Sequence, residues 1–252
     1  MHHLTRQTVG TNHPLVRIDP RVKLISALTI LVMVISGKGF FFPVLVTTLS
    51  LALCLYLGVR SKHLLLRFAE PLFIAVMVIL LKFLFSGQVP LFSFRLFGFL
   101  VTGHGDGLTD GLLIASRIVG AVSITALLGF STSFTDLMGA LAWFRVPACF
   151  IEVALFAWRY LFLLFDDALV IYSAQKNRLG YAGFVRGARS FGTLAGALVI
   201  KAFDSSQSVS VAMAQRGYDG TMPLLRHRPF RASEILCSMG FLAIMAVIRV
   251  QF

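Results

Sequence analysis

The chain has 252 residues, of which 57% are hydrophobic and 13% charged, with a net charge of +12 and a mean hydropathy of +0.84. Soluble proteins average about 45–50% apolar and about 25% charged residues, so this composition excludes an ordinary soluble protein and indicates an integral membrane protein. The positive charge alone would suggest a nucleic-acid partner, but its placement along the chain gives another explanation.

Five apolar segments predict membrane-spanning helices, each of which needs about 20 apolar residues. In chain order they are residues 22–35, 40–57, 71–85, 112–130 and 235–250. The predicted fold is therefore all-α, a polytopic integral membrane protein with five transmembrane helices and long cytoplasmic helices. The count becomes six if residues 146–172, which are apolar but carry four charges, also cross instead of lying at the membrane surface.

The connection at residues 92–110 is aromatic and then glycine-rich, which predicts an interfacial loop on the outer side. Two charges fall within or near predicted spans, Lys82 and Arg117. Charge inside a membrane is costly and suggests function. Both side chains lie near predicted outer ends, however, so we favour extension towards the membrane surface.

The distribution of lysine and arginine gives the orientation, because cytoplasmic segments collect these residues. With the N-terminus inside and five spans, 18 of the 23 basic residues fall on the inner side, and eleven of them lie within 131–231. This explains the charge without any nucleic acid. We predict three regions: 1–130 with four transmembrane helices, a cytoplasmic region at 131–231, and a C-terminal transmembrane helix at 232–252.

The cytoplasmic region predicts three helices. Ser133 and Asp136 resemble a capping box that starts a short helix ending before Pro147. Pro147 can open a second helix, which we expect to end near Leu179 with Gly180 at the C′ position, one residue beyond its cap. A third helix, 184–216, follows the 3.6-residue apolar period and ends at Gly217.

Contacts between these cytoplasmic helices are also predicted. Two small-residue pairs, Gly183/Gly187 and Gly192/Gly196, permit close helix crossing. The acidic pair Asp166-Asp167 is expected to bind Arg159 or Arg189.

Two arginines, Arg178 and Arg216, occur in related Ala…Arg…Gly runs at the ends of the two long helices. Either arginine alone could merely offset the negative end of its own helix dipole. The same arrangement occurs twice, about 38 residues apart, which favours a role in binding a partner over a role in the helix alone. The planar guanidinium fork matches carboxylates, so each arginine could bind an acidic groove on a soluble partner.

Taken together, these motifs resemble those of the transmembrane T components of energy-coupling factor (ECF) transporters, and the resemblance extends over nearly the whole chain. Four motifs occur in that family's order: Asp19-Pro20-Arg21, Asp136 with Arg145-Val146-Pro147, Ala174…Arg178-Leu179-Gly180, and Ala212…Arg216-Gly217. His13-Pro14-Leu15 ahead of the first motif most resembles the cobalt branch, CbiQ. The nickel branch stays as an alternative.

The resemblance implies a division of labour. A separate membrane S component binds the metal, two cytoplasmic ATP-binding-cassette (ABC) ATPases hold ATP and Mg, and the T component, embedded in the bilayer, couples them. It implies that Arg178 and Arg216 contact the ATPases, with Ala174, Gly180, Ala212 and Gly217 around them. Asp19, Arg21, Asp136, Arg145 and Pro147 are supporting residues. This chain is then a non-catalytic subunit that binds no cofactor.

Other function classes find less support in the sequence. There is no G-x-x-x-x-G-K-[ST], G-x-S-x-G or H-E-x-x-H motif, which disfavours an ATPase or other enzyme. A stand-alone secondary transporter usually contains inverted repeats, and none is visible. His2 and His3 could bind copper or nickel, but a disordered chain end is the simpler interpretation.

Overall fold

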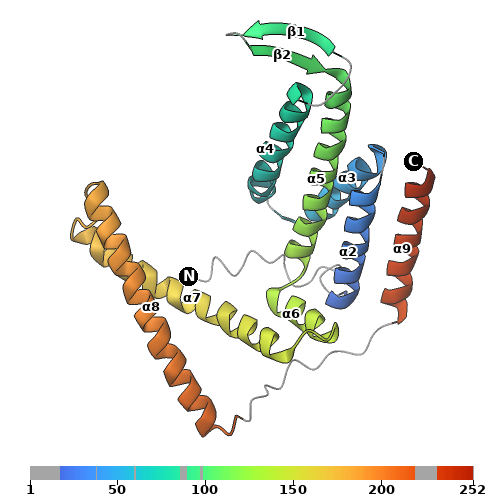
Figure 1. Cartoon of the computed structure of the whole chain (residues 1–252). Helices are drawn as coiled ribbons and strands as arrows, with labels where there is room; N and C mark the ends of the chain where they lie inside the picture. Colours follow the sequence, from blue (N-terminus) through green and yellow to red (C-terminus); the bar gives the residue numbers. More distant parts are fainter. Residues whose placement is uncertain are drawn as a thin grey trace. The chain divides into compact units, whose positions relative to one another are not determined.

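The computed structural model describes residues 18–37, 39–59, 61–85, 90–96, 99–218 and 232–251. The predictions for His2, His3 and His13 lie outside them. The elements are α2 (Pro20–Ser36), α3 (Phe41–Tyr56), α4 (Ser61–Phe85), β1 (Pro90–Leu96), β2 (Phe99–His104), α5 (Gly105–Ser131), α6 (Phe134–Trp143), α7 (Ala148–Asn177), α8 (Phe184–Gln215) and α9 (Ala232–Gln251) (Figure 1).

The chain divides into two compact units, and each is described by itself. The membrane unit is Met1–Ala140 with Arg228–Phe252, and the coupling unit is Leu141–His227. In the membrane unit, α5 packs against α2, α3 and α4, while α9 packs chiefly on α2. The core gathers side chains from four of these helices: Val34, Phe42, Val46, Ile124 and Met245.

One end of the membrane unit is tied together by the residues that begin α2. Asp19 caps the helix, because its carboxylate accepts a 3.0 Å hydrogen bond from the Arg21 backbone N–H. The Asp19 backbone N–H donates to the Glu234 carboxylate at the start of α9, at 2.9 Å. Lys23 Nζ donates to the Ser131 carbonyl at the end of α5, at 3.0 Å. The starts of α2 and α9 and the end of α5 therefore lie at the same end of this unit.

The opposite end of the unit is held by two arginines. The Arg117 guanidinium of α5 donates to the Gly37 carbonyl, the C-cap of α2. Arg249 near the end of α9 donates to Ser36 Oγ at 2.9 Å. A cation at a helix C-terminus is favourable because the last carbonyls carry partial negative charge. The intramembrane charge of Arg117 thus has a structural role at a helix end.

The prediction of a loop at residues 92–110 is wrong, because the structure has regular elements there. β1 and β2 form an antiparallel hairpin that pairs Leu96 with Phe99, and α5 begins at Gly105. Alternating apolar and polar residues in this segment are typical of strands. Gly111 lies within α5, and a glycine is needed there because α4 passes close to it: a Cβ would lie 3.0 Å from the Ile79 Cα.

The structure confirms an all-α polytopic membrane protein, with this hairpin as an addition. Four described helices are long and apolar enough to cross a bilayer: Leu64–Phe85 of α4, Gly105–Ser131, Ala148–Asn177 and Ser233–Gln251. Two predicted spans, α2 and α3, are helices of only 17 and 16 residues. The predicted start of the third span at Pro71 is wrong, because α4 begins at Ser61 and continues through this proline.

In the coupling unit, α7 and α8 form an antiparallel helical hairpin. Asp167 of α7 forms a salt bridge with Lys201 of α8, with 2.5 Å between Oδ1 and Nζ. The sequence predicted that Asp166 and Asp167 bind Arg159 or Arg189, and for Asp167 this is wrong. A Cβ at Gly192 or Gly196 would meet nothing within 4 Å. The predicted close crossing at these glycines is therefore not present between the described helices.

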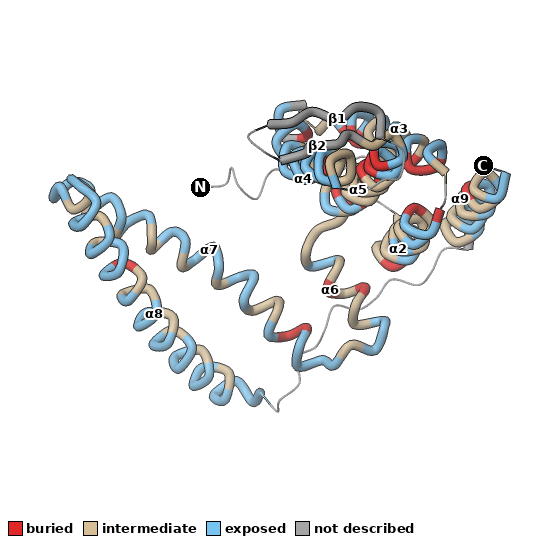
Figure 2. The backbone as a smooth tube through the Cα atoms, turned by 45° about the horizontal axis from the view of Figure 1, so that its top comes forward, coloured by how far each residue is buried: buried red, intermediate tan, exposed pale blue. Residues whose placement is uncertain are grey.

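Few side chains of this hairpin are covered. Only Ile151, Glu152 and Leu194 are buried in α7 and α8. Figure 2 shows both helices as largely exposed or intermediate along their length. Several exposed residues are large and apolar, and Phe184 is 91% exposed. Such a number of exposed large apolar side chains on two helices suits contact with a protein or a membrane.

Candidate coupling site

Arg178 is the cap residue at the C-terminus of α7. Its backbone N–H donates to the Gln175 carbonyl at 3.2 Å. The N–H groups of Leu179 and Gly180 then donate to Lys176 and Gln175, at 3.1 and 2.9 Å. These two bonds define a Schellman motif, which satisfies the last carbonyls of a helix. Arg178 therefore lies at the C-terminal end of a 30-residue helix.

Arg216 has the same position at the C-terminus of α8. Its backbone N–H donates to the carbonyls of Ala212 and Met213, at 3.2 and 3.0 Å. The N–H of Gly217 donates to the Ala214 carbonyl and that of Tyr218 to the Met213 carbonyl, both at 3.1 Å. The two arginines are thus structurally equivalent, each four residues after an alanine, Ala174 in α7 and Ala212 in α8.

The structure does not bring the two arginines together. Arg178 precedes α8 and Arg216 follows it, so they are separated by a helix of 32 residues. At 1.5 Å per residue this is about 48 Å. Each guanidinium can therefore contact a different partner surface.

The predicted C′ role of Gly180 is wrong. The C′ position after α8 is Gly217, with φ of 75°, and the C′ position after α7 is Leu179, with φ of 58°. Side chains other than glycine are strained in this left-handed region. Gly180 is required for a different reason, because a Cβ there would lie 2.8 Å from Ser190 Oγ and 2.9 Å from the Gln175 carbonyl.

The residues predicted as supporting form the corner between α6 and α7 and the start of α2. One of the two bonds of a capping box is present, because Ser133 Oγ accepts from the Asp136 N–H at 3.2 Å; the Ser133 hydroxyl in turn donates to the Asp136 carboxylate at 2.6 Å. Arg145 has φ of 61° just after α6, and Pro147 is the N-cap of α7. These residues set the direction of the chain, as Asp19 does for α2, and Arg21 is buried beside it.

Tyr218 and Glu152 were not expected from the sequence. The Tyr218 hydroxyl donates to the Glu152 carboxylate at 3.0 Å, which joins the far end of α8 to the beginning of α7. The carboxylate is buried, and no local pattern in the sequence relates two residues 66 positions apart. Since Arg216 lies two residues before Tyr218, this bond fixes the position of the second arginine-bearing tip.

We expect Tyr218→Phe to weaken this tip. A hydrogen bond to a charged group contributes about 1.5–3 kcal/mol, and its loss leaves a buried carboxylate less well satisfied. Hydrogen exchange at the end of α8 in the detergent-solubilised protein should quicken. Tyr172→Phe is the matched control, since its hydroxyl makes no hydrogen bond to the described residues. Equal exchange in both variants would contradict a positioning role for Tyr218.

Arg178 also has neighbours that the sequence did not single out. Arg186 and Arg189, at the beginning of α8, line the same pocket as Arg178. The only hint in the sequence is their spacing of three residues, which places both on one face of a helix. We call this feature the elbow pocket.

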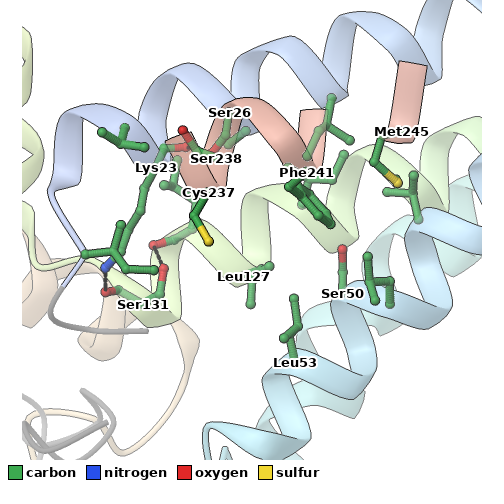
Figure 3. Close-up of a pocket in the computed structure, with 18 of the residues that line it drawn as sticks. Lys23, Ser26, Ser50, Leu53, Leu127, Ser131, Cys237, Ser238, Phe241 and Met245 are labelled. Carbon is green, nitrogen blue, oxygen red and sulfur yellow. Dashed lines mark hydrogen bonds between the residues drawn. The ribbon is translucent and has the colours of Figure 1, made fainter. Parts of the chain in front are cut away.

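A second cavity lies in the membrane unit between α2, α3, α5 and α9, with a volume of about 610 Å³ (Figure 3). Its lining is mostly apolar, for example Leu53, Leu127 and Phe241, with Lys23 bound to Ser131 at one end. Divalent metals prefer oxygen and imidazole ligands, which this lining does not concentrate. Among the described residues, no group of three or more His, Cys, Asp or Glu side chains could hold a metal ion.

Comparisons with known proteins identify the family of this chain. The family model for the cobalt transport protein CbiQ matches residues 11–226. The chain belongs to the CbiQ family. It is 31% identical to the cobalt transport protein CbiQ of Rhodobacter capsulatus over 215 residues, which cover 85% of this chain and 84% of that protein.

Two further relatives of the CbiQ-family chain come from different lineages. The energy-coupling factor transporter transmembrane protein EcfT of Staphylococcus aureus is 31% identical over 193 residues, covering 65% of this chain and 72% of the relative. An uncharacterised protein of Methanocaldococcus jannaschii is 28% identical over 228 residues, covering 90% and 85%. The family relationship therefore extends over the membrane unit and the coupling unit.

Proposed function

We propose that this CbiQ-family protein is the transmembrane coupling subunit of an ECF-type importer for cobalt ion. Arg178 and Arg216 dock onto two cytoplasmic ABC ATPase subunits, which hold ATP and Mg. A separate membrane S component binds the metal. The chain itself performs no chemistry and holds no cofactor.

The observation that carries this proposal is the repeated helix end. Two arginines occupy the same position in two Schellman motifs, about 48 Å apart by the rise of an α-helix. Within the described residues, neither guanidinium makes a salt bridge or a side-chain hydrogen bond. Two equivalent, unoccupied cationic tips suit two equivalent acidic partners, because an arginine fork binds carboxylates in a directional way.

The hydrogen bonds of the membrane unit support a cytoplasmic coupling unit. The helix α5 ends at Ser131 and α9 begins at Ala232, and residues at both of these points are bonded to the start of α2. An exit and a return at the same end require an even number of membrane crossings between them. α7 is a candidate span but α8 is not, so an inserted α7 would lack a helix to bring the chain back. This favours five spans, with α7 and α8 both on the side that holds most lysine and arginine.

The exposed apolar surface of the coupling unit supports a partner as well. Large apolar side chains on α7 and α8 are uncovered, including Val170 at 67% and Val199 at 70% exposure. A two-helix hairpin with so little buried surface gains most of its stability from what it packs against. Contact with ATPases and with the S component would cover this surface.

Copurification tests the proposal. The tagged chain is expressed with a candidate ABC ATPase and a candidate metal-binding membrane protein from the same organism, and is purified in a mild detergent. We expect both ATPase and S component in stable amounts, and ATP hydrolysis only when the ATPase is present. A chain that transports cobalt into liposomes with no ATPase would overturn the proposal in favour of a stand-alone transporter.

A further inference from the structure

The helix packing of the membrane unit leaves a space beside α9. Helix α9 packs chiefly on α2, whereas α3 packs chiefly on α5. The cavity of about 610 Å³ lies between these two pairs of helices. Figure 3 shows Cys237 and Phe241 of α9 on one side of it, and Ser50 and Leu53 of α3 on the other. One face of α9 is therefore held by α2, while another borders a space that no described side chain fills.

The wall of this cavity is unsuited to water. Most of its side chains are aliphatic or aromatic. Its hydroxyl groups include Ser26 Oγ, which donates to the Lys23 carbonyl at 2.9 Å. Ser238 Oγ likewise donates to the Ile235 carbonyl of its own helix at 2.9 Å. A buried water needs two to four polar partners, and a cavity of this volume would hold about 20 waters at liquid density. A hydrocarbon occupant is therefore favoured.

One end of the cavity is polar. Lys23 and Glu234 are the only charged residues among the described ones that line it. Lys23 Nζ donates to the Ser131 carbonyl at 3.0 Å. The Glu234 carboxylate accepts from the Asp19 backbone N–H at 2.9 Å. Bonds to other helices thus hold one cation and one carboxylate at the end of the cavity where α2 and α9 begin.

The length of the cavity matches one leaflet of a bilayer. Its lining residues on α9 extend from Ser233 to Met245, and those on α3 extend from Leu57 back to Val46. At 1.5 Å per residue these stretches are about 18 and 17 Å long. Half of the hydrocarbon core of a bilayer is about 15 Å thick. The polar end lies at the start of α2, which the distribution of lysine and arginine predicts to be cytoplasmic.

We propose that this cavity binds one phospholipid of the cytoplasmic leaflet. A hydrocarbon chain occupies the apolar part, and a headgroup with a phosphate and an ammonium group lies at Lys23 and Glu234. The lysine suits the phosphate and the carboxylate suits the ammonium, since hydrogen bonds between charged groups are the strong ones. The proposal goes beyond the coupling of transport and does not depend on it.

A helix of a partner protein fits the same space poorly. With its side chains, an α-helix is about 10–12 Å in diameter and rises about 5.4 Å per turn. A cavity of about 610 Å³ therefore has room for only about one turn of such a helix. A single hydrocarbon chain is far thinner, so it can extend along the whole cavity.

The headgroup has to supply the selectivity of the site. Lipid tails are as apolar as the cavity wall, so the transfer of a chain from the bilayer into the cavity changes the free energy little. The ammonium of phosphatidylethanolamine can donate hydrogen bonds to Glu234, and the quaternary ammonium of phosphatidylcholine cannot. Phosphatidylglycerol is anionic, whereas Lys23 and Glu234 together have no net charge. Phosphatidylethanolamine should therefore bind best of the three.

Native mass spectrometry of the full chain tests the site. The chain is purified in a mild detergent, stripped of lipid, and mixed with equal amounts of phosphatidylethanolamine, phosphatidylcholine and phosphatidylglycerol that have the same chains. We expect one tightly bound phosphatidylethanolamine. Leu53→Trp fills the cavity from α3 and should weaken this binding about tenfold. Leu55→Trp is the matched control and should bind as the wild type does, because Leu55 is 58% exposed and lies outside the lining.

A second variant tests the headgroup without changing the volume of the cavity. Glu234→Gln keeps an oxygen that accepts from the Asp19 N–H but removes the negative charge. We expect the preference for phosphatidylethanolamine over phosphatidylglycerol to fall about tenfold, since a hydrogen bond to a charged group is lost. An unchanged preference in this variant would overturn the assignment of the headgroup.

Three further outcomes would overturn the inference. One is equal lipid binding by the Leu53→Trp and Leu55→Trp variants, which would show that the lipid lies around the protein and not in the cavity. Another is equal binding of the three lipids, or a preference for phosphatidylglycerol, in the wild type. The third is found in the copurified transporter: if Leu53→Trp alone releases the metal-binding membrane protein and retains its lipid, the cavity belongs to a partner helix.

Discussion

Arg216→Ala is expected to abolish cobalt uptake and to release ATPase from the membrane. Truncation of an arginine at the centre of a binding site costs about 2–4 kcal/mol, which is roughly 30-fold or more in affinity. The guanidinium extends from a helix end that the backbone bonds of Ala212, Met213 and Ala214 fix in place, so the substitution should leave α8 folded. Uptake of radioactive cobalt by cells expressing the whole transporter measures the effect.

Two control variants make the result specific. Arg159→Ala removes an exposed arginine from α7, away from both helix ends, and should retain uptake. Arg216→Lys keeps the charge but loses the planar fork, so we expect partial uptake. Wild-type uptake in Arg216→Ala, with ATPase still bound in the membrane, would contradict the role assigned to this residue.

Gly180→Ala is expected to damage the elbow, whereas Leu179→Gly is not. A Cβ at position 180 would lie under 3.0 Å from both Ser190 Oγ and the Gln175 carbonyl, so the Ser190 hydroxyl must rotate away and the turn after α7 must shift from the backbone of Gln175. Overpacking of this kind costs about 1–3 kcal/mol. Leu179 is 70% exposed and has a left-handed backbone, so glycine there relieves strain of about 1–2 kcal/mol, offset in part by greater freedom of the unfolded chain.

Thermal unfolding of the purified protein and cobalt uptake check this pair. We expect Gly180→Ala to melt earlier and transport less, and Leu179→Gly to match or exceed the wild type in both. The reverse order, with Leu179→Gly the more harmful variant, would show that Gly180 is the helix-terminating residue after all.

The sequence predicted the helices well where a local signal marks their ends. Ser133 with Asp136, Pro147 and Gly217 each act through the backbone of their own turn, and the structure has α6, α7 and α8 within one or two residues of the predicted bounds. Family motifs identified Arg178 and Arg216, whose roles stay predictions. The structure adds that both arginines occupy the same position in a Schellman motif. The sequence did not show this, because glycine follows Arg178 by two residues and Arg216 by one.

Errors occurred where distant residues decide the local structure. Gly105 and Gly107 contributed to the prediction of a loop but lie in the first turn of α5. The apolar segment 71–85 begins at Pro71, but α4 starts ten residues earlier, at Ser61, and includes this proline. The Tyr218–Glu152 bond and the meeting of Arg178 with Arg186 in one pocket depend on how α8 returns along α7, which no short pattern encodes.

Photo-crosslinking from the two helix tips tests the central claim most directly. A benzophenone amino acid is placed at Asn177 or at Gln215, the exposed residue before each arginine, in membranes that contain the whole transporter. Coupling through both tips predicts adducts with an ATPase subunit from each position, and none from exposed Leu65 of α4. Adducts with lipid alone from both tips, in membranes where the ATPase is assembled and active, would contradict it.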